Sequence, residues 1–215
     1  MKIGVFDSGV GGLSFVNAIK KALPNHEVEF ANDVAHLPYG SKTAAEILNF
    51  AQPKLQKLSS DGCSVIVVAC NTVSTTVISE LRQKIKIPLI AVEPMVKSAA
   101  IQTKTGVIGV CATPATLKSP RYKWLKSNFA KDIKVLEPDC SDWAYMIENN
   151  SIDEDKVRSR IEEVLEQKAD VIVLGCTHYH WIEKNIRSIA NGQAIVLQPE
   201  QAVIKELKRV LAQLP

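Results

Sequence analysis

The chain has 215 residues, of which 46% are hydrophobic and 23% are charged, and both shares are ordinary for a folded protein. They exclude an intrinsically disordered chain, and the formal net charge of +3 is too small to indicate a nucleic-acid or membrane-binding surface. The apolar stretches are far shorter than the roughly 20 residues of a membrane span, and the N-terminus has no signal-peptide pattern, so we expect a soluble cytoplasmic protein.

Short, almost continuous apolar segments alternate along the chain with segments of helical periodicity. Apolar runs without polar alternation are typical of parallel strands that are covered on both faces. The alternation predicts a doubly wound α/β architecture, with an exposed turn between helices at 148–155. In chain order the predicted strands are 3–6, 28–31, 65–69, 89–92, 105–110, 133–136, 171–174 and 194–197, and the predicted helices are 12–23, 42–59, 74–85, 94–102, 115–128, 153–168, 181–190 and 200–213.

The second half of the chain repeats the first. Residues 64–72 match residues 170–178, and Cys176 follows Cys70 by 106 residues at the same place after its strand. Val-Ile-Val strands resemble one another in any α/β protein, but a cysteine placed identically after both strands is less common. We therefore predict two similar α/β lobes that face each other across a cleft, residues 1–96 and residues 97–199.

Five cysteines cannot all be paired in disulfides, and we expect free thiols in a reducing compartment. Cys63, Cys111 and Cys140 are predicted to be packing residues. Cys70 and Cys176 are different, because each follows a strand and precedes a predicted helix, whose N-terminus favours a thiolate.

Two thiols that face each other across a cleft suit the inversion of a carbon centre by proton transfer. One thiolate removes a proton, and the thiol on the opposite face supplies another. Asp7, at the end of the first strand, and His178, two residues after Cys176, are candidates to assist the thiols. Asp7 also fits a helix cap or turn ahead of Gly9, and the two roles are compatible. Asn71 and Thr72 are expected to cap the helix after Cys70.

Three further motifs have both a structural and a functional interpretation. The loop 7–12 lacks the glycine of a dinucleotide fingerprint and the lysine of a P-loop, and backbone N–H groups that bind a small carboxylate fit it better. The segment 38–40 is either a rigid turn or a source of N–H groups and a phenol for a polar ligand. Cys176-x-His178-x-His180 is an alternative zinc site, but its spacing is not standard, and we favour the thiol interpretation and no metal.

Four motifs together resemble the cofactor-independent glutamate racemases of the aspartate/glutamate racemase family. They are DSGVGGL at 7–13, PYG at 38–40, ACNT at 69–72 and LGCTHY at 174–179, in the family's order and spread over nearly the whole chain. The Gly-Cys-Thr-His form is similar to the glutamate branch rather than the aspartate branch. The resemblance implies two lobes around a substrate cleft, with the C-terminal helix 200–215 packing back on the first lobe. It also implies interconversion of L- and D-glutamate without a cofactor, to supply D-glutamate for peptidoglycan.

The resemblance assigns roles to individual residues. Cys70 and Cys176 would be the two acid/base thiols, with Asp7 assisting the first thiol and His178 and Glu148 the second. The positions that match substrate-binding residues are Ser8, Pro38, Tyr39, Gly40, Asn71, Thr72, Thr113, Thr116 and Thr177. The chain departs from the family pattern at Val73, at His180, where proline is usual, and at Gln198-Pro199, where Asp-Ser is usual.

The expected partner is the small-molecule substrate glutamate, with neither nucleic acid nor a membrane, and a homodimer is left open. One alternative is a racemase of the same fold that acts on aspartate or another α-substituted acid. The other is a non-catalytic homologue that binds a ligand or a protein partner, which the departures from the family pattern favour.

Overall fold

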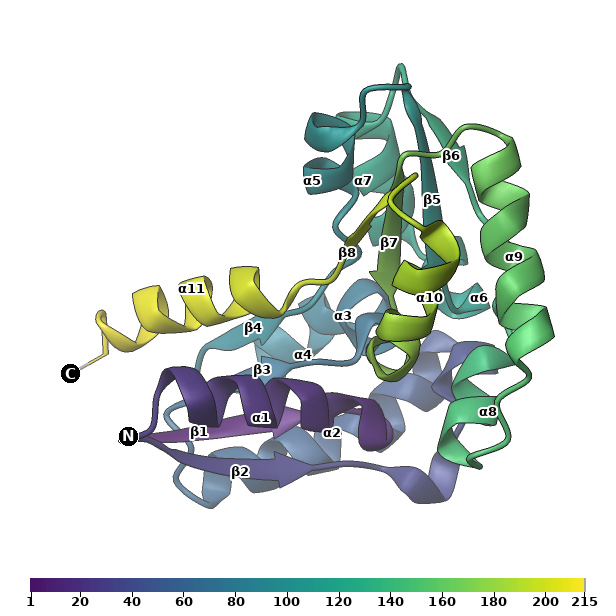
Figure 1. Ribbon diagram of the computed structural model, residues 1–215. Helices are drawn as coiled ribbons and strands as arrows, with labels where there is room; N and C mark the ends of the chain where they lie inside the picture. Colours follow the sequence, from purple (N-terminus) through teal and green to yellow (C-terminus); the bar gives the residue numbers. More distant parts are fainter. Residues whose placement is uncertain (215) are drawn as a thin grey trace.

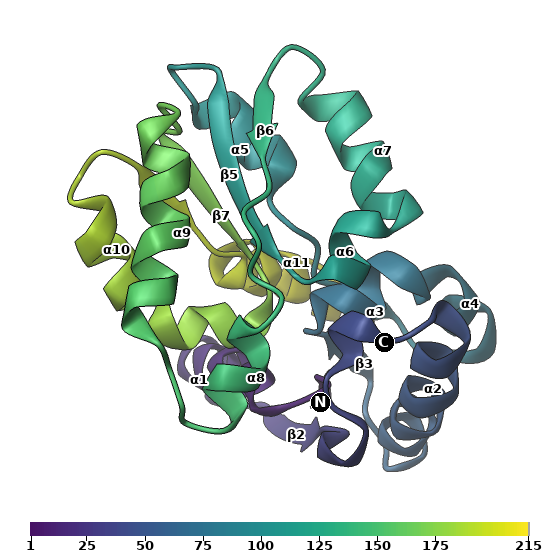
Figure 2. The same cartoon turned by 90° about the vertical axis from the view of Figure 1, so that its right-hand side faces the viewer.

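The computed structural model describes residues 1–214, which form two lobes of the same topology. Each lobe has a four-stranded parallel sheet, with the strand order β2-β1-β3-β4 in the first lobe and β6-β5-β7-β8 in the second. Figure 1 shows the two lobes one above the other, and Figure 2 shows the same arrangement from the side. The predicted α/β class with two similar lobes is confirmed.

The first lobe places an apolar cluster on each face of its sheet. Helix α2 begins with a capping box between Thr43 and Glu46 and packs one apolar stripe against the sheet. Helix α1 covers the other face. The elements of this lobe are β1 (Lys2–Phe6), η1 (Val10–Gly12), α1 (Leu13–Ala22), β2 (Glu27–Ala31), η2 (Val34–His36), η3 (Tyr39–Ser41), α2 (Ala44–Ser60), β3 (Val65–Val68), α3 (Asn71–Thr76), α4 (Ile78–Lys84) and β4 (Leu89–Ala91).

The second lobe repeats this plan, again with an apolar cluster on each face of its sheet. Side-chain caps from Thr113, Ser119 and Asp153 begin three of its helices. Its elements are α5 (Val96–Gln102), β5 (Val107–Ala112), α6 (Pro114–Lys118), α7 (Pro120–Phe129), β6 (Lys134–Leu136), α8 (Trp143–Glu148), α9 (Glu154–Glu166), β7 (Val171–Gly175), η4 (Thr177–Ile182), α10 (Glu183–Ala190) and β8 (Ile195–Leu197).

The last helix, α11 (Glu200–Leu211), leaves the second lobe after β8 and runs along the first (Figure 1). Its buried residues Val203, Leu207 and Leu211 lie in the same apolar cluster as Ile3 and Val5 of β1. The chain therefore passes between the lobes twice, once after β4 and once before α11. Pro215, the final residue of the predicted segment 200–215, lies outside the described residues.

Three local predictions about helices are wrong. The predicted helix 74–85 is divided at Val77, whose φ of −132° and ψ of 12° are not helical. The predicted helix 115–128 is divided at Ser119, which caps a new helix that has Pro120 at its first position. Helix α8 occupies residues 143–148, where no helix was predicted.

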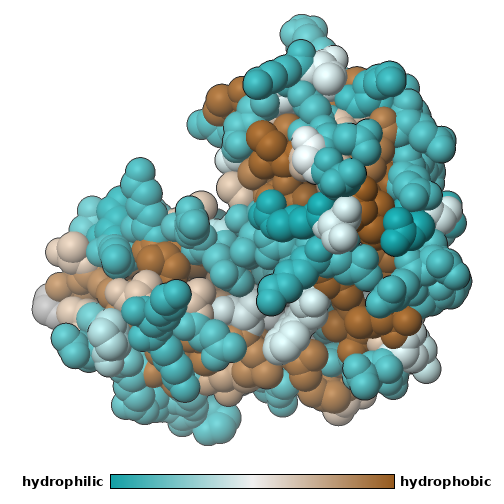
Figure 3. All heavy atoms as spheres, viewed as in Figure 1, coloured by the Kyte–Doolittle hydropathy of each residue, from teal (hydrophilic) through white to brown (hydrophobic). Residues whose placement is uncertain are grey.

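On the face shown in Figure 3, hydrophilic side chains lie beside apolar areas on both lobes. A notch separates α11 from the second lobe on the face shown, and a cavity of about 220 Å³ lies there between β4, α5 and α11. Within residues 1–214, no helix is both long enough and apolar enough to cross a membrane.

Candidate active site

The carboxyl ends of the central strands bring the residues of interest together. The register of β1 on β3 places Asp7 and Cys70 at one edge of the first sheet. The register of β5 on β7 places Thr113 beside Cys176 at the corresponding edge of the second sheet. In parallel α/β folds this edge is where ligands bind.

Cys70 is a buried free thiol at the N-terminus of α3. Its Sγ lies 3.4 Å from the Ser8 hydroxyl. Burial and the nearby Asp7 carboxylate raise the pKa of Cys70 to about 12, and the charge of Cys176 contributes to the same rise. The backbone N–H of Val73 lowers the pKa, as expected at a helix N-terminus, but it is outweighed. The prediction that the helix N-terminus makes Cys70 favour the thiolate is therefore wrong.

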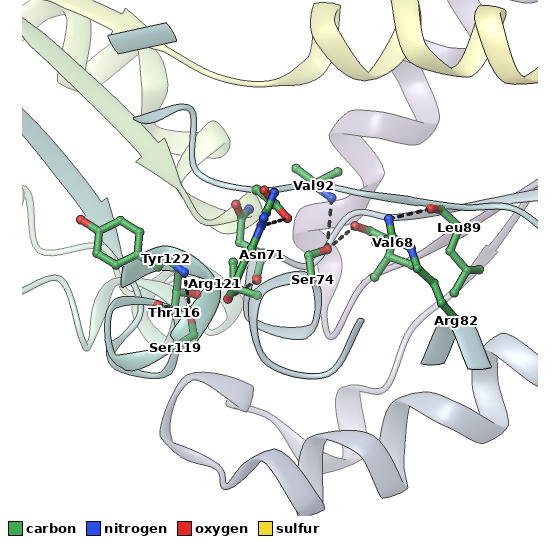
Figure 4. A network of polar contacts seen from close by, with 12 residues as sticks. Val68, Asn71, Ser74, Arg82, Leu89, Val92, Thr116, Ser119, Arg121 and Tyr122 are labelled. Atoms are coloured by element: carbon green, nitrogen blue, oxygen red, sulfur yellow. Dashed lines mark hydrogen bonds and ion pairs between the residues drawn. The ribbon is translucent and has the colours of Figure 1, made fainter. Parts of the chain in front are cut away.

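Hydrogen bonds from Ser74 attach helix α3 to the end of the first sheet, with the N-terminus of the helix at Cys70. The Ser74 hydroxyl donates to the Val68 carbonyl at 2.9 Å and accepts from the Val92 N–H at 3.1 Å (Figure 4). Asn71 and Thr72 lie in the first turn and do not cap the helix as predicted, because the N-cap position is the cysteine itself. Both side-chain polar atoms of Asn71 are buried and have no hydrogen-bond partner in the described chain.

Asp7 is fully buried, and its carboxylate is occupied by hydrogen bonds. Oδ2 accepts from the N–H groups of Gly9 and Gly12, each at 3.1 Å, which is the turn role expected from the sequence. Oδ1 accepts from the Thr177 hydroxyl at 3.0 Å, and Thr177 comes from the other lobe. Burial raises the pKa of Asp7 against these hydrogen bonds and the charge of His178.

Cys176, His178 and Glu148 form a line on the second-lobe side. The Cys176 Sγ lies 3.7 Å from His178 Nδ1, and His178 Nε2 lies 3.3 Å from Glu148 Oε1. Burial alone would lower the pKa of His178, but its contacts with Cys176 and Glu148 raise it well above its usual range. Burial likewise opposes ionisation of Glu148, while His178 and the Val10 N–H lower its pKa. The arrangement favours an imidazolium between a carboxylate and the sulfur.

Three threonine hydroxyls meet between the lobes. Thr72 lies 2.9 Å from Thr113 and 3.4 Å from Thr116, and Thr113 donates to Thr116 at 3.1 Å. Gly40 packs against them so closely that a Cβ on it would lie 2.8 Å from the Thr113 Cβ. The structure therefore brings the predicted residues from α3, α6 and η3 to one place.

Tyr39 does not point its phenol at open space. Its hydroxyl donates to Asp33 Oδ2 at 2.7 Å, and His36 Nδ1 lies 2.8 Å from the same oxygen. The Asp33 N–H in turn donates to the Ser8 carbonyl at 3.1 Å. Asp33, which is 3% exposed, was not predicted from the sequence, because the surrounding Glu29, Asn32 and His36 make it look like an ordinary polar loop residue. Residues 38–40 are predicted from the sequence to offer N–H groups and a phenol to a ligand. Because the phenol of Tyr39 is bonded to Asp33, only the N–H groups of Tyr39 and Gly40 fit that expectation.

The glycine loop uses its N–H groups internally. Gly9 and Gly12 donate to Asp7, and Val10 donates to Glu148 Oε1 at 2.9 Å. The prediction that this loop binds a small ligand carboxylate is wrong for these three N–H groups, because the protein's own carboxylates accept from them.

The remaining motif residues separate. His180 Nδ1 turns to the Ser14 hydroxyl at 3.2 Å, while His178 faces Cys176. In residues 1–214 no three His, Cys, Asp or Glu side chains come together in a way that could hold a metal ion. Cys63, Cys111 and Cys140 are buried free thiols in the apolar clusters, as predicted for packing residues.

A cavity of about 290 Å³ leads to the candidate site between η2 of the first lobe and α8 of the second. Exposed apolar side chains, Val34 and Tyr145, stand on opposite sides of it, one from each lobe. His178 and Glu148 form its inner wall. The full lining is Val34, Leu37, Pro38, Ala144, Tyr145, Glu148, Asn149 and His178.

Comparison with known proteins identifies the family. Residues 3–207 match the family model described as Asp/Glu/Hydantoin racemase. A glutamate racemase from Pseudomonas aeruginosa is 37% identical over an alignment of 215 positions. The alignment covers 98% of this chain and 81% of that protein. The structure is similar to Escherichia coli glutamate racemase in complex with L-glutamate and the activator UDP-MurNAc-ala, with a TM-score of 0.91, 28% identity and coverage of 99% and 83%. It is also similar to Francisella tularensis glutamate racemase in complex with D-glutamate, with a TM-score of 0.81, 30% identity and coverage of 99% and 81%. The chain therefore belongs to the Asp/Glu/Hydantoin racemase family.

Proposed function

We propose that the protein is a glutamate racemase that interconverts L- and D-glutamate by proton transfer between two cysteine thiols. The observation that carries the proposal is the equivalent placement of Cys70 and Cys176. Each follows the third strand of its sheet in chain order within its lobe, each is buried, and the charge of one affects the pKa of the other. The relatives named as glutamate racemases support the choice of substrate.

Racemisation needs one base and one acid on opposite faces of the α-carbon. A thiolate takes the α-proton of glutamate, the electron pair moves toward the α-carboxylate, and the opposite thiol delivers a proton to the other face. The first sulfur then carries the proton that the substrate lost, and the second sulfur is a thiolate. The product is the opposite enantiomer, and the enzyme is left ready for the reverse reaction.

The two thiols have different surroundings. Burial and the charge of Asp7 raise the pKa of Cys70 to about 12, so near pH 7 this residue is a protonated thiol and can donate a proton. Beside Cys176, the His178 side chain keeps its proton because Glu148 lies on its other side. This imidazolium stabilises negative charge on the Cys176 sulfur.

The polar groups between the thiols are suited to an amino acid with two carboxylates. The Asn71 amide is buried with no partner among residues 1–214, and such a group costs about 1–3 kcal/mol unless a ligand or water satisfies it. The hydroxyls of Ser8, Thr72 and Thr113 lie at the same edges and are available to exchange their mutual hydrogen bonds for bonds to the substrate. The backbone N–H groups of Tyr39 and Gly40 are proposed as further donors.

The cellular role follows from the proposed reaction. D-Glutamate is a building block of bacterial peptidoglycan, so the enzyme supplies a cell-wall precursor. All five cysteines are free thiols, which fits a reducing compartment and thus the cytoplasm.

The test is incubation with L-glutamate, D-glutamate and L-aspartate separately in D₂O. Solvent deuterium at the α-carbon is followed by NMR, and the enantiomers are separated by chiral chromatography. The proposal predicts D-glutamate carrying α-deuterium from L-glutamate, and the reverse from D-glutamate. Reaction of aspartate instead of glutamate would assign the aspartate alternative, and no exchange with any substrate at high enzyme concentration would assign a non-catalytic protein.

A further inference from the structure

His180 lies two residues after His178 but has no place in the proposed proton transfer. Its side chain is 3% exposed. Nδ1 lies 3.2 Å from the Ser14 hydroxyl and 3.7 Å from Glu200 Oε1. One buried imidazole therefore contacts polar groups from α1 and α11 while it belongs to η4.

The three segments that meet at His180 are those that assemble the site. Segment η4 begins directly after Cys176 and carries His178. Helix α1 continues from the glycine loop of the first lobe, and Glu200 is the first residue of α11, directly after the second passage between the lobes. We call Ser14, His180 and Glu200 the interlobe joint.

The protonation state of the joint follows from its burial. Burial, together with the charge of His178, lowers the pKa of His180 to about 4, so the ring is neutral near pH 7 and carries one N–H. Nε2 is buried without a partner in the described part of the chain. Because an unpaired buried acceptor is tolerated better than an unpaired N–H, the proton belongs on Nδ1.

With the proton on Nδ1, each donor of the joint has an acceptor. The ring N–H donates to the Ser14 hydroxyl oxygen, and the Ser14 O–H is free to donate to Glu200. Burial raises the pKa of Glu200, while the neighbouring Ser14 and Gln198 side chains oppose that rise.

The neighbours of His180 show how η4 is held. The Thr177 hydroxyl donates to Asp7 of the first lobe, whereas the Tyr179 hydroxyl donates to the Cys140 carbonyl within the second lobe at 2.7 Å. The contact of His180 with Ser14 is thus the second side-chain hydrogen bond from η4 to the first lobe. Two such bonds, on either side of His178, fix both the position and the rotation of this segment.

We propose that His180 is a positioning residue, which through Ser14 and Glu200 holds η4, and with it His178 and Cys176, against the glycine loop of the first lobe. It touches neither the substrate nor the reacting atoms. Its kinetic consequence rests on the proposed racemase function, but the existence of the joint does not.

The test compares His180→Leu with His180→Asn, whose amide N–H replaces the Nδ1 donor, and with His26→Leu as a matched control in the turn before β2. His180→Leu is expected to lower kcat by about tenfold or more, since small displacements of reacting groups are costly. KM is expected to change less than kcat, because the substrate-binding positions other than Thr177 lie outside η4. His180→Asn is expected to recover most of kcat, and His26→Leu to leave both constants unchanged.

A second readout does not depend on activity. Amide hydrogen exchange followed by mass spectrometry is expected to speed up in peptides covering 9–16 and 176–183 of His180→Leu, and in neither the Asn variant nor the His26 variant. If the wild type fails to racemise glutamate, the proposed function fails, and the exchange result alone decides whether the joint exists.

Three results would overturn the proposal. The first is amide hydrogen exchange in peptides 9–16 and 176–183 of His180→Leu at the same rate as in the wild type. The second is a kcat of His180→Asn as low as that of His180→Leu. The third is faster exchange spread evenly over both lobes, because this would mean that His180 contributes only to global stability.

Discussion

The hydroxyl of Thr177, in the second lobe, donates a hydrogen bond of 3.0 Å to the carboxylate of Asp7, in the first. Both residues flank a proposed catalytic group, since Thr177 follows Cys176 directly and Asp7 lies at the carboxyl end of the strand beside that of Cys70. The bond therefore connects the two lobes beside the proposed site. It also gives a hydrogen-bond donor to a fully buried carboxylate, whose burial without a partner would cost a large desolvation free energy.

This close approach predicts that Gly11→Ala separates the lobes. A Cβ on Gly11 would lie 2.7 Å from the backbone nitrogen of His178, which is too close for a carbon atom. We expect kcat/KM to fall by about 10²-fold or more, because the second-lobe cysteine loop must move away. The measurement is steady-state racemisation in both directions.

Gly192→Ala is the matched control for this variant. Gly192 has a φ of +75° in an open turn, and a Cβ added to it would have no neighbour within 4 Å. The change therefore costs about 1 kcal/mol of backbone strain and leaves the site alone. Equal activity losses in the two variants would contradict the proposed packing of the glycine loop on η4.

Glu148→Gln is expected to lower the pKa of His178. The contacts with Cys176 and Glu148 raise this pKa against burial, and the neutral amide would no longer favour the imidazolium. For a histidine with a raised pKa, the stabilisation is complete below the unfolded-state pKa and is lost as pH rises through the folded-state value. In the variant the folded state is therefore expected to lose this stabilisation at a lower pH than in the wild type. The loss of activity at high pH that depends on His178 is expected to move to lower pH in the same way.

Imidazole NMR titration of the wild type and of Glu148→Gln checks this shift. Glu183→Gln is the control, because Glu183 pairs with Arg187 on the second-lobe surface. An unchanged His178 titration in Glu148→Gln would show that the 3.3 Å contact does not influence the imidazole.

Tyr39→Phe is expected to destabilise the fold by about 1–3 kcal/mol, because it removes a hydrogen bond to the buried Asp33. In Tyr122→Phe, Glu137 keeps its contact with Lys126, so the cost should be below about 1 kcal/mol. Urea unfolding of both variants measures the difference. A Tyr39 variant as stable as wild type would mean that Asp33 does not depend on the phenol.

Leu207→Ala is expected to cost about 2–5 kcal/mol of unfolding free energy. Leu207 is fully buried between α11 and the first-lobe sheet, so its truncation leaves a cavity there. Lys208→Ala, on the exposed side of the same helix, should change stability by less than about 0.5 kcal/mol. Similar stabilities for the two variants would show that α11 is only loosely attached to the first lobe.

The strands were predictable because their signal is local, and the thiol pair was predictable because the two halves of the sequence repeat. Buried parallel strands are continuous apolar runs, such as residues 65–68 and 171–174. The cysteines stand out because the repeat places them identically. The burial of Cys63, Cys111 and Cys140 followed from the ordinary behaviour of cysteine.

Other features depend on contacts between distant segments, which the sequence does not show. The pKa of Cys70 is set by burial and by Asp7 rather than by the helix N-terminus that follows it. The glycine-loop donors are used by Asp7 and Glu148, the latter 138 residues away from Val10 in the chain. Helix α8 has only six residues and no clear periodicity, so its role in presenting Glu148 emerges only in the fold.

One feature was missed although its signal is local. Ser119-Pro120 is a cap followed by the residue most favoured at the first helical position, and it marks the start of α7 in the sequence itself. The mixed apolar and basic residues on both sides fit a helix, and this concealed the boundary.

The most direct test of the central claim is α-proton exchange and racemisation of glutamate in D₂O by Cys70→Ala and Cys176→Ala, with Cys63→Ala as the matched control. If the two thiols act on opposite faces of the α-carbon, each single variant loses racemisation by at least about 10³-fold, since the acid or the base is absent. Cys63→Ala, which removes a buried packing thiol, keeps wild-type turnover at a temperature where it is folded. Full racemisation by either the Cys70 or the Cys176 variant would contradict the two-thiol account.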